Sequence, residues 1–412
     1  MNNFFKDIRT IERMTAGPLG YHLPKYALVL HTNGYTRSTG RRMLDTVTDF
    51  NQWLQTKRIL PGQITSDHAE QYLRRLDRTH AWPFTSGRVA LTRWLTLLRE
   101  QKMISSTATP APGPAEQVVS DYDHYLDRQC GLSCRTRAAY GPLVLRFLTN
   151  KFGRGSINLK KLCASDLIQC VRDYALGRSG KRALLMASAL RSFLRFARYR
   201  GDLVADLAAH VPSVAAGPAT LMPKAFSSGQ VKQILAHCPQ DTTVGRRDYA
   251  ILLLLARLGL RASEVIHLRL DDLDWEASSI KLRGKCNRLD ELPLPKDVGT
   301  AIAAYLKNDR PRARNSRHVF LLSRAPLTGF KCVSSVCLIV KQALARAGID
   351  STKKGSHQFR HTLACEMLRH GRSLGEIGEI LRHRSPDTTA IYAKVDFSTL
   401  RPLALAWPGG AL

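Results

Sequence analysis

The sequence is short of acidic residues. Asp and Glu together number 33 against 62 Lys and Arg, which leaves a formal charge of +29. Because this excess runs along the chain instead of filling one tail, it favours a polyanionic partner, and a long nucleic acid duplex is the commonest one. Charge alone does not distinguish DNA from RNA.

Long apolar runs are missing as well. The most apolar stretch, Ala250–Ala256, is far too short to cross a bilayer and predicts a core helix. The opening segment, MNNFFKDIRTIERM, lacks the apolar core and the small-residue cleavage site of a secretory signal. We therefore expect a soluble intracellular protein with no membrane partner.

Several chemical motifs are absent. The nine cysteines include no C-x-x-C pair and no Cys/His cluster with the spacing of a zinc site, which predicts reduced thiols. The sequence also has no phosphate-binding P-loop and no carboxylate triad for metal ions. These absences fit chemistry that uses no metal, no ATP and no other cofactor.

With 412 residues, the chain is long enough for two or three domains. Two segments rich in Pro, Gly, Ala and Ser, residues 104–117 and 211–226, interrupt the helical pattern and predict linkers. The expected modules are residues 1–105, 115–212 and 223–402, followed by a tail at 403–412.

The first two modules resemble each other. Apolar and capping positions recur at offsets of 97 and 99 residues, with the three- and four-residue spacing of amphipathic helices. The pattern predicts two copies of one small helical bundle, although unrelated bundles share such spacings. The matched positions are Ala90, Leu91, Trp94 and Leu95 with Ala189, Leu190, Phe193 and Leu194, Ser66 and Asp67 with Ser165 and Asp166 at expected helix N-caps, and Thr39, Met43, Val47 and Phe50 with Thr136, Tyr140, Val144 and Phe147.

The third module combines helices with a hairpin. Residues 278–295 predict strand, turn and strand, with the turn at 285–288. Glycine, serine and proline at the ends of the apolar patterns predict the helix boundaries. The expected helices are 248–258, 262–268, 333–347, 356–370, 373–381 and 386–394. The expected fold class is therefore mainly α with a small β-hairpin or sheet in the C-terminal domain, an α+β fold.

Cationic side chains suited to phosphate occur at three places in this module. Arg261 follows a helix end, with Glu264 three residues on to orient its guanidinium, and such a planar group grips two oxygens of one phosphate. Lys285 lies in the hairpin turn. His357 and Arg360 share one face of the first turn of a helix, where the dipole favours an anion. Taken singly, each pattern is also typical of a solvated surface.

A nucleophile and another imidazole follow these cations. Tyr392 lies in the expected helix TTAIYAKV, nine residues after His383. A phenol has a pKa of about 10 and attacks poorly unless cations and a base stand close. Transfer of a phosphodiester needs cations, a nucleophile and a proton donor, and this set supplies all three. His361, next to Arg360, is expected to be merely solvated.

In combination, these motifs resemble those of the tyrosine recombinase, or phage integrase, family. The matching segments are LGLRASEV, RGKCNRLDELPLP, HQFRHT, LRHRSPDTTAIYAKV and, earlier, VVSDYDHYLDRQCGLSCRTRAAY. The resemblance covers about residues 115–400. It implies a helical core-binding (SAM-like) domain at 115–212 and a catalytic domain at 223–402. By this reading, residues 1–105 are a further helical DNA-binding module.

The resemblance also implies the reaction and one role for each of six side chains at the scissile phosphate. The enzyme would be a site-specific recombinase that cleaves and rejoins double-stranded DNA through a 3′-phosphotyrosyl intermediate. The implied roles are a phosphate clamp for Arg261 and Arg360, protonation of the departing 5′ oxygen for Lys285, hydrogen bonding and proton handling for His357 and His383, and covalent attack for Tyr392.

The assembly and setting are also implied. The family resemblance suggests a homo-tetramer on two duplexes carrying specific recombination sites, alone or with related recombinases, in the bacterial cytoplasm at the nucleoid. The tail beyond Asp396 would dock onto a neighbouring subunit, and its sequence PLALAWPGGAL fits such a peg or a disordered end equally well. The extra first module and the ending AIYAKVD favour a recombinase carried by a mobile element, acting in integration or transposition, although resolution of dimeric DNA uses the same chemistry.

The chain departs from the family pattern at three points. LRH stands where LGH is usual, HQFRH where HxLRH is usual, and Lys394 follows the tyrosine where His is frequent. None of these changes removes a catalytic side chain. Arg382, however, replaces a glycine at a helix end, which bears on the position of His383.

Two other functions fit the same residues. A type IB topoisomerase-like enzyme, which nicks and closes one duplex, uses a similar set of side chains. A non-catalytic DNA-binding regulator could keep the fold without cutting. The presence of all six side chains argues against the regulator, because a binder has no need of a phenol and a lysine aimed at one phosphate.

Overall fold

The computed structural model describes most of the chain, namely residues 1–16, 19–78, 84–104, 112–153, 155–177, 180–214, 225–284, 289–312, 316–351 and 354–393. Contacts divide the chain into two compact units, one formed by Met1–Ser106 with Met222–Leu412 and the other by Thr107–Leu221. Separate hydrophobic cores occupy residues 4–104, 115–211, 226–359 and, on a smaller scale, 364–392. The predicted tail 403–412 and the predicted hairpin turn 285–288 lie outside the described residues.

The first part of the chain is a bundle of helices around an aromatic core. Tyr26 and Trp94 meet edge to face with ring centroids 5.4 Å apart, and the Trp94 indole N–H donates to the Asn51 side chain at 3.2 Å. The elements are α1 (Ile8–Thr15), η1 (Gly20–His22), α2 (Leu23–Thr32), α3 (Arg37–Thr56), η2 (Pro61–Gln63), α4 (Ser66–Arg78) and α5 (Phe84–Glu100).

The unit Thr107–Leu221 repeats the order of α2 to α5. Tyr122 and Phe193 again meet edge to face, with centroids 5.5 Å apart. Ser133 caps the second long helix by accepting from the backbone N–H three residues on, as Thr36 does for α3. The elements are α6 (Pro114–Arg128), α7 (Cys134–Phe152), η3 (Leu159–Lys161), α8 (Ala164–Ala175), α9 (Gly180–Tyr199) and η4 (Leu207–His210).

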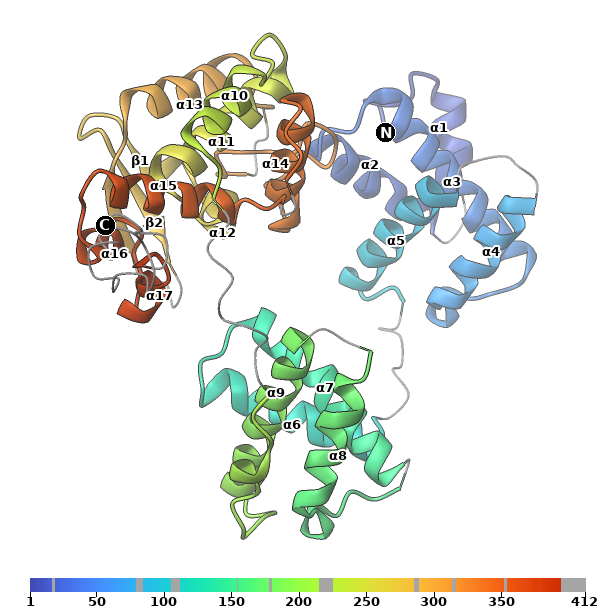
Figure 1. The fold of residues 1–412 in the computed structure, drawn as a ribbon. Helices are drawn as coiled ribbons and strands as arrows, with labels where there is room; N and C mark the ends of the chain where they lie inside the picture. The colour runs from blue at the N-terminus through green and yellow to red at the C-terminus, as the bar shows by residue number, and fades with distance from the viewer. Residues whose placement is uncertain are drawn as a thin grey trace, which may run out of the picture. The chain divides into compact units, whose positions relative to one another are not determined.

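The last part of the chain surrounds one buried helix, α11 (Thr243–Leu258), which is contacted by α10, α13, α14 and α15 (Figure 1). Ile251 and the four leucines that follow it, Leu252–Leu255, are all buried. Burial on every side explains why this run of the helix shows no polar face. The other elements are α10 (Ser228–Ala236), α12 (Ala262–His267), η5 (Leu270–Asp272), β1 (Leu273–Asp274), β2 (Ser279–Arg283), β3 (Leu289–Pro293), α13 (Lys296–Asn308), α14 (Ser334–Arg346), α15 (His357–Arg369), α16 (Leu374–Ile380) and α17 (Pro386–Ala390).

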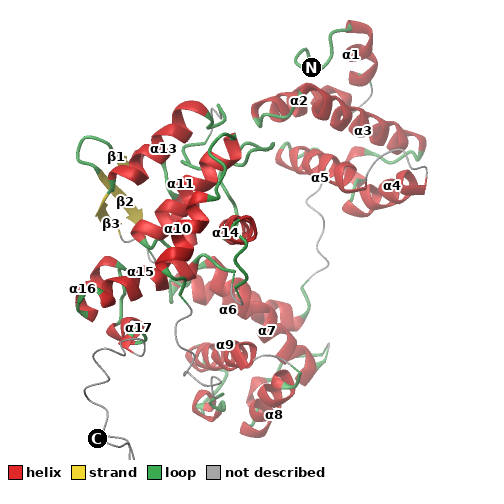
Figure 2. Cartoon of the chain, turned by 45° about the horizontal axis from the view of Figure 1, so that its top comes forward, coloured by secondary structure: helices red, strands yellow, loops and turns green. Residues whose placement is uncertain are grey.

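The strands form one small antiparallel sheet in the order β1-β2-β3, drawn in yellow in Figure 2. Leu273 pairs with Ile280, and Arg283 pairs with Leu289 across the predicted turn. The predicted hairpin is therefore confirmed on both sides of the turn. Strand β1 was not predicted, because two residues are too few to show an alternating pattern.

The predicted fold class is confirmed, and most predicted helices match to within one or two residues. Helix α11 begins five residues earlier than predicted, because the Thr242 side chain accepts from the Gly245 N–H and caps it there. The prediction of a helix over 386–394 was wrong, since α17 ends at Ala390 and Tyr392 lies in the turn that follows. Helices α10 and α13 were not predicted.

The expected N-caps at Ser66 and Ser165 were also wrong. Ser66 is already the first residue of α4. In α8 the cap is Cys163, whose backbone N–H donates to the Asp166 carboxylate at 3.1 Å. None of the helices in the described ranges combines the length and the apolar character that a bilayer span requires.

The core around α11 gives a direct test of the fold. We expect Leu253→Ala to lower the free energy of unfolding by about 2–5 kcal/mol, because the side chain is 1% exposed and its removal leaves a cavity. Leu338→Ala on α14, where the side chain is exposed, is the matched control and should have little effect. Equal losses in a urea titration would contradict the packing described.

Candidate active site

Arg261 is held at a sharp corner between α11 and α12. Gly259 ends α11 with a φ of 56°, a backbone conformation that favours glycine. A Cβ atom at Gly259 would lie 2.9 Å from Cδ2 of Leu381 and 3.0 Å from Cδ2 of Leu363. The corner therefore packs directly against the segment that leads to His383.

The Arg261 side chain is fixed along one edge. Its Nη1 donates to Oε1 of Glu264 at 2.8 Å, and its backbone N–H donates to Oε2 of the same carboxylate at 2.8 Å. The Glu264 side chain is only 3% exposed, whereas that of Arg261 is 38% exposed. The spacing of three residues predicted this orientation, which leaves part of the guanidinium open to an incoming anion.

Arg360 lies beside this corner and is almost fully buried. Its Nη1 donates to the carbonyl of Gly259 at 2.8 Å, and its Nη2 donates to the carbonyl of Leu381. Arg261 Nη2 donates to the next carbonyl in the chain, that of Arg382, at 3.2 Å. The two guanidinium groups are therefore neighbours, held by consecutive carbonyls.

Burial and the like charges of Arg261 and Arg382 lower the pKa of Arg360 to about 10. The group still carries its proton at neutral pH, because that value lies well above 7. An anion that reached this position would offset both effects, since it would replace lost solvation and separate the positive charges.

The two predicted histidines have different partners. His357 begins α15, and its ring lies 4.5 Å from that of His361, centroid to centroid. His383 Nδ1 lies 2.7 Å from the Thr389 hydroxyl on α17. Burial first, and then the charge of Arg360, lowers the pKa of His357. The same two causes, in the same order, lower the pKa of His383 to about 4, so this ring is neutral at pH 7.

Tyr392 is buried beside these histidines, at 1% exposed. Its hydroxyl lies 2.9 Å from Nδ1 of His361, and its ring stacks nearly parallel to that of His383, with centroids 6.4 Å apart. Burial raises the pKa of Tyr392 to about 12, while Arg360 pulls it in the opposite direction. The phenol is therefore protonated at neutral pH.

His361 is the functional candidate that the sequence did not reveal. The expectation that this residue is merely solvated was wrong, because its ring contacts both His357 and the Tyr392 hydroxyl. A helical spacing of four residues from His357 was the available signal, since it places both rings on one face of α15.

The structure thus brings together five of the six predicted side chains, Arg261, His357, Arg360, His383 and Tyr392. The sixth, Lys285, lies outside the described residues. The pairing of Arg283 with Leu289 shows where the strands on either side of that turn end. The site offers two cations, a phenol and three imidazoles around one corner of the fold, a set suited to phosphoryl transfer.

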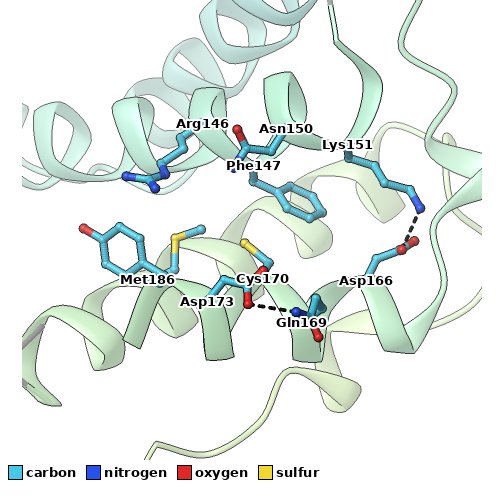
Figure 3. Close-up of a pocket in the computed structure, with 10 residues that line it drawn as sticks. Arg146, Phe147, Asn150, Lys151, Asp166, Gln169, Cys170, Asp173 and Met186 are labelled. Atoms are coloured by element: carbon cyan, nitrogen blue, oxygen red, sulfur yellow. Dashed lines mark hydrogen bonds and ion pairs between the residues drawn. The ribbon is translucent and has the colours of Figure 1, made fainter. Parts of the chain in front are cut away.

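A separate pocket of about 200 Å³ lies in the unit Thr107–Leu221 (Figure 3). Its polar side chains are largely paired with each other, Lys151 with Asp166 at 2.6 Å and Gln169 with Asp173 at 2.8 Å. Burial raises the pKa of the Cys170 thiol to about 11, which leaves it unreactive at neutral pH. The pocket shows no chemistry comparable to that of the corner.

Two family models match this chain, one over the part that contains the site and one over the module before it. The family model "Phage integrase family" matches residues 224–399, and the model "Phage integrase, N-terminal SAM-like domain" matches residues 119–201. A relative in Sinorhizobium fredii, named "Putative integrase/recombinase y4rA", is 46% identical over 97% of this chain and 97% of its own length. Tyrosine recombinase XerA of Thermococcus onnurineus is 32% identical, over 69% of this chain and 93% of its own.

Solved structures show the same fold at lower identity. The XerH site-specific recombinase in its post-cleavage complex with difH substrate has a TM-score of 0.58 at 16% identity, covering 71% of this chain and 97% of that one. The Tn1549 transposon integrase in complex with transposon right end DNA has a TM-score of 0.51 at 18% identity, covering 69% and 99%.

The low pKa of His383 predicts how stability depends on pH. Because the folded pKa is about 4, below the ordinary value of 6.5, the unfolded chain binds the proton more readily. The stability that depends on the neutral ring is complete above pH 6.5 and is lost as the pH falls toward 4. We expect His383→Gln to make the fall in unfolding free energy on acidification from neutral pH shallower in urea titrations. An unchanged slope would contradict this account.

Proposed function

The chain belongs to the phage integrase, or tyrosine recombinase, family, and from this premise we propose how its own residues carry out the reaction. It is a site-specific DNA recombinase, an enzyme that transfers DNA strands. The observation that carries the proposal is the pair of guanidinium groups held by consecutive carbonyls next to a buried phenol.

Arg261 and Arg360 clamp the scissile phosphate. The open edge of Arg261 receives one non-bridging oxygen, while Glu264 keeps the other edge in place. Arg360 exchanges a carbonyl partner for a second oxygen. Charge-assisted hydrogen bonds of this kind are stronger than those to neutral carbonyls, so the exchange is favourable. The clamp also stabilises the charge that develops on the phosphate during transfer.

Tyr392 is the nucleophile. Its oxygen forms a bond to phosphorus as the bond from phosphorus to the 5′ oxygen breaks, which leaves a 3′-phosphotyrosyl link. The phenol proton passes to His361, which already contacts the hydroxyl, and Lys285 supplies the proton to the 5′ oxygen. His357 and His383 donate hydrogen bonds at the phosphate. The free 5′ hydroxyl of another strand then reverses these steps, so the energy of the bond is conserved.

The first module is a second DNA-binding bundle. Residues 1–105 and 115–212 each contain 16 Lys and Arg and eight Asp and Glu, so both carry the same excess of positive charge. The common order of helices, the matching caps and the equivalent aromatic pairs support descent from one bundle. With two such bundles, the protein covers a longer stretch of duplex than a catalytic domain with one.

The active assembly is a homo-tetramer on two duplexes carrying specific recombination sites, and it acts in the cytoplasm at the nucleoid. Its biological setting is a mobile element. The extra first module and the ending AIYAKVD support this setting.

A suicide duplex with a nick near the crossover tests the chemistry. The unaltered protein should form a denaturation-resistant adduct with DNA that carries its recombination site, and Tyr392→Phe should form none, because only the phenol oxygen is lost. Tyr199→Phe, at an exposed side chain, is the matched control and should still form the adduct. An adduct that survives in Tyr392→Phe would refute the assignment of the nucleophile.

Measuring the affinity of the protein for a long and a short DNA duplex tests whether the first module, residues 1–105, makes its own contact with DNA. Changing Arg74→Glu and Arg75→Glu together on α4, where both are exposed, should weaken binding to a long duplex and lower the dependence of log K on log salt by about 1–2. Binding to a duplex trimmed to the core site should not change. Arg172→Glu on α8, 98 residues after Arg74, should instead weaken binding to both duplexes. Equal effects of the α4 change on both lengths would argue against a separate contact.

A further inference from the structure

Arg382 has a backbone conformation that is unusual for its residue type. Its φ is 55°, in the left-handed region where glycine is favoured and a side chain brings strain. It directly follows the helical turn that ends α16 and directly precedes His383. An arginine that tolerates this conformation needs compensating contacts.

The Arg382 side chain makes those contacts inside the protein, where it is 7% exposed. Its Nη2 donates to Oε2 of Glu264 at 2.8 Å, and its Nη1 donates to the carbonyl of Ile380 at 3.2 Å. Glu264 is the same carboxylate that fixes one edge of Arg261. One buried carboxylate therefore bridges two arginines, and Arg261 returns a hydrogen bond to the Arg382 carbonyl.

Arg382 also faces the hairpin. Its Nε lies 3.9 Å from Oδ2 of Asp290, near the start of β3 and five residues after Lys285 in the chain. This Nε is buried and has no hydrogen-bond partner among the described residues, so the ion pair with Asp290 is its polar contact there. Three segments that carry proposed catalytic groups, the α12 corner, the loop before α17 and the hairpin, thus meet at one side chain.

We propose that Arg382 is a positioning residue that holds Arg261 in its phosphate-binding orientation by sharing Glu264 with it. The inference rests on the proposed role of Arg261. With Arg382 present, Glu264 is neutralised from two sides, and Arg261 keeps one edge for a phosphate. Without it, the buried carboxylate has Arg261 as its remaining strong partner and draws that guanidinium away from DNA.

Single-turnover cleavage of the suicide duplex tests this role. Arg382→Gly suits the left-handed backbone and removes only the side chain, so its cleavage rate should fall at least ~10-fold while its affinity for DNA stays within about twofold. Arg382→Lys, which keeps a positive charge near Glu264, should recover part of the rate. Arg382→Gln also removes the positive charge but keeps a long polar side chain. It should show the same loss of rate, and it serves as the second variant if Arg382→Gly does not fold.

A double-mutant comparison separates positioning from general stability. If Arg382 acts through Glu264, the Arg382→Gly change should cost little further rate in a Glu264→Gln background, where no carboxylate needs neutralising. Full additivity of the two rate losses would overturn the proposal, and so would a normal cleavage rate in Arg382→Gly and Arg382→Gln. Absence of cleavage by the unaltered protein on its cognate site would instead refute the proposed function, and this inference with it.

Discussion

Two guanidinium groups tie the corner after α11 to the end of α16. Arg360 reaches the carbonyls of Gly259 and Leu381, and Arg261 reaches the carbonyl of Arg382. The bonds to Gly259 and Arg382 join residues 101 and 121 positions apart, and the close packing at this corner excludes a side chain at Gly259. The rest of the site depends on this tie, because His383 and Tyr392 follow directly from the segment that it holds.

These hydrogen bonds hold positively charged side chains in a part of the site that is shielded from solvent. Burial is the largest cause of the low pKa values of Arg360 and His383 and of the raised pKa of Tyr392, and neighbouring positive charges lower the first two further. A bound anion would offset the like-charge repulsion at Arg360 and His383. The Tyr392 phenol is protonated at neutral pH, and its hydroxyl lies within hydrogen-bond distance of His361.

Sequence patterns predicted the parts of this site that depend on local spacing. Arg261 and Glu264 lie three residues apart and make the predicted contact, and the helix carrying His357 and Arg360 begins as expected. The family resemblance implied that these side chains meet, but the individual hydrogen bonds between distant segments could not be predicted, because no local pattern encodes them. The pairing of His361 with Tyr392 spans 31 residues, and that of Glu264 with Arg382 spans 118. The last helix was predicted too long because its apolar positions continue beyond the point where the chain turns to bury Tyr392.

The most direct test is the structure of the covalent complex trapped on a nicked duplex. We expect a phosphorus atom bonded to the Tyr392 oxygen, with its non-bridging oxygens within hydrogen-bond distance of Arg261 and Arg360, and with Glu264 still bridging Arg261 and Arg382. A DNA phosphate bound elsewhere, or an adduct on another residue while both arginines remain on their carbonyl partners, would contradict it.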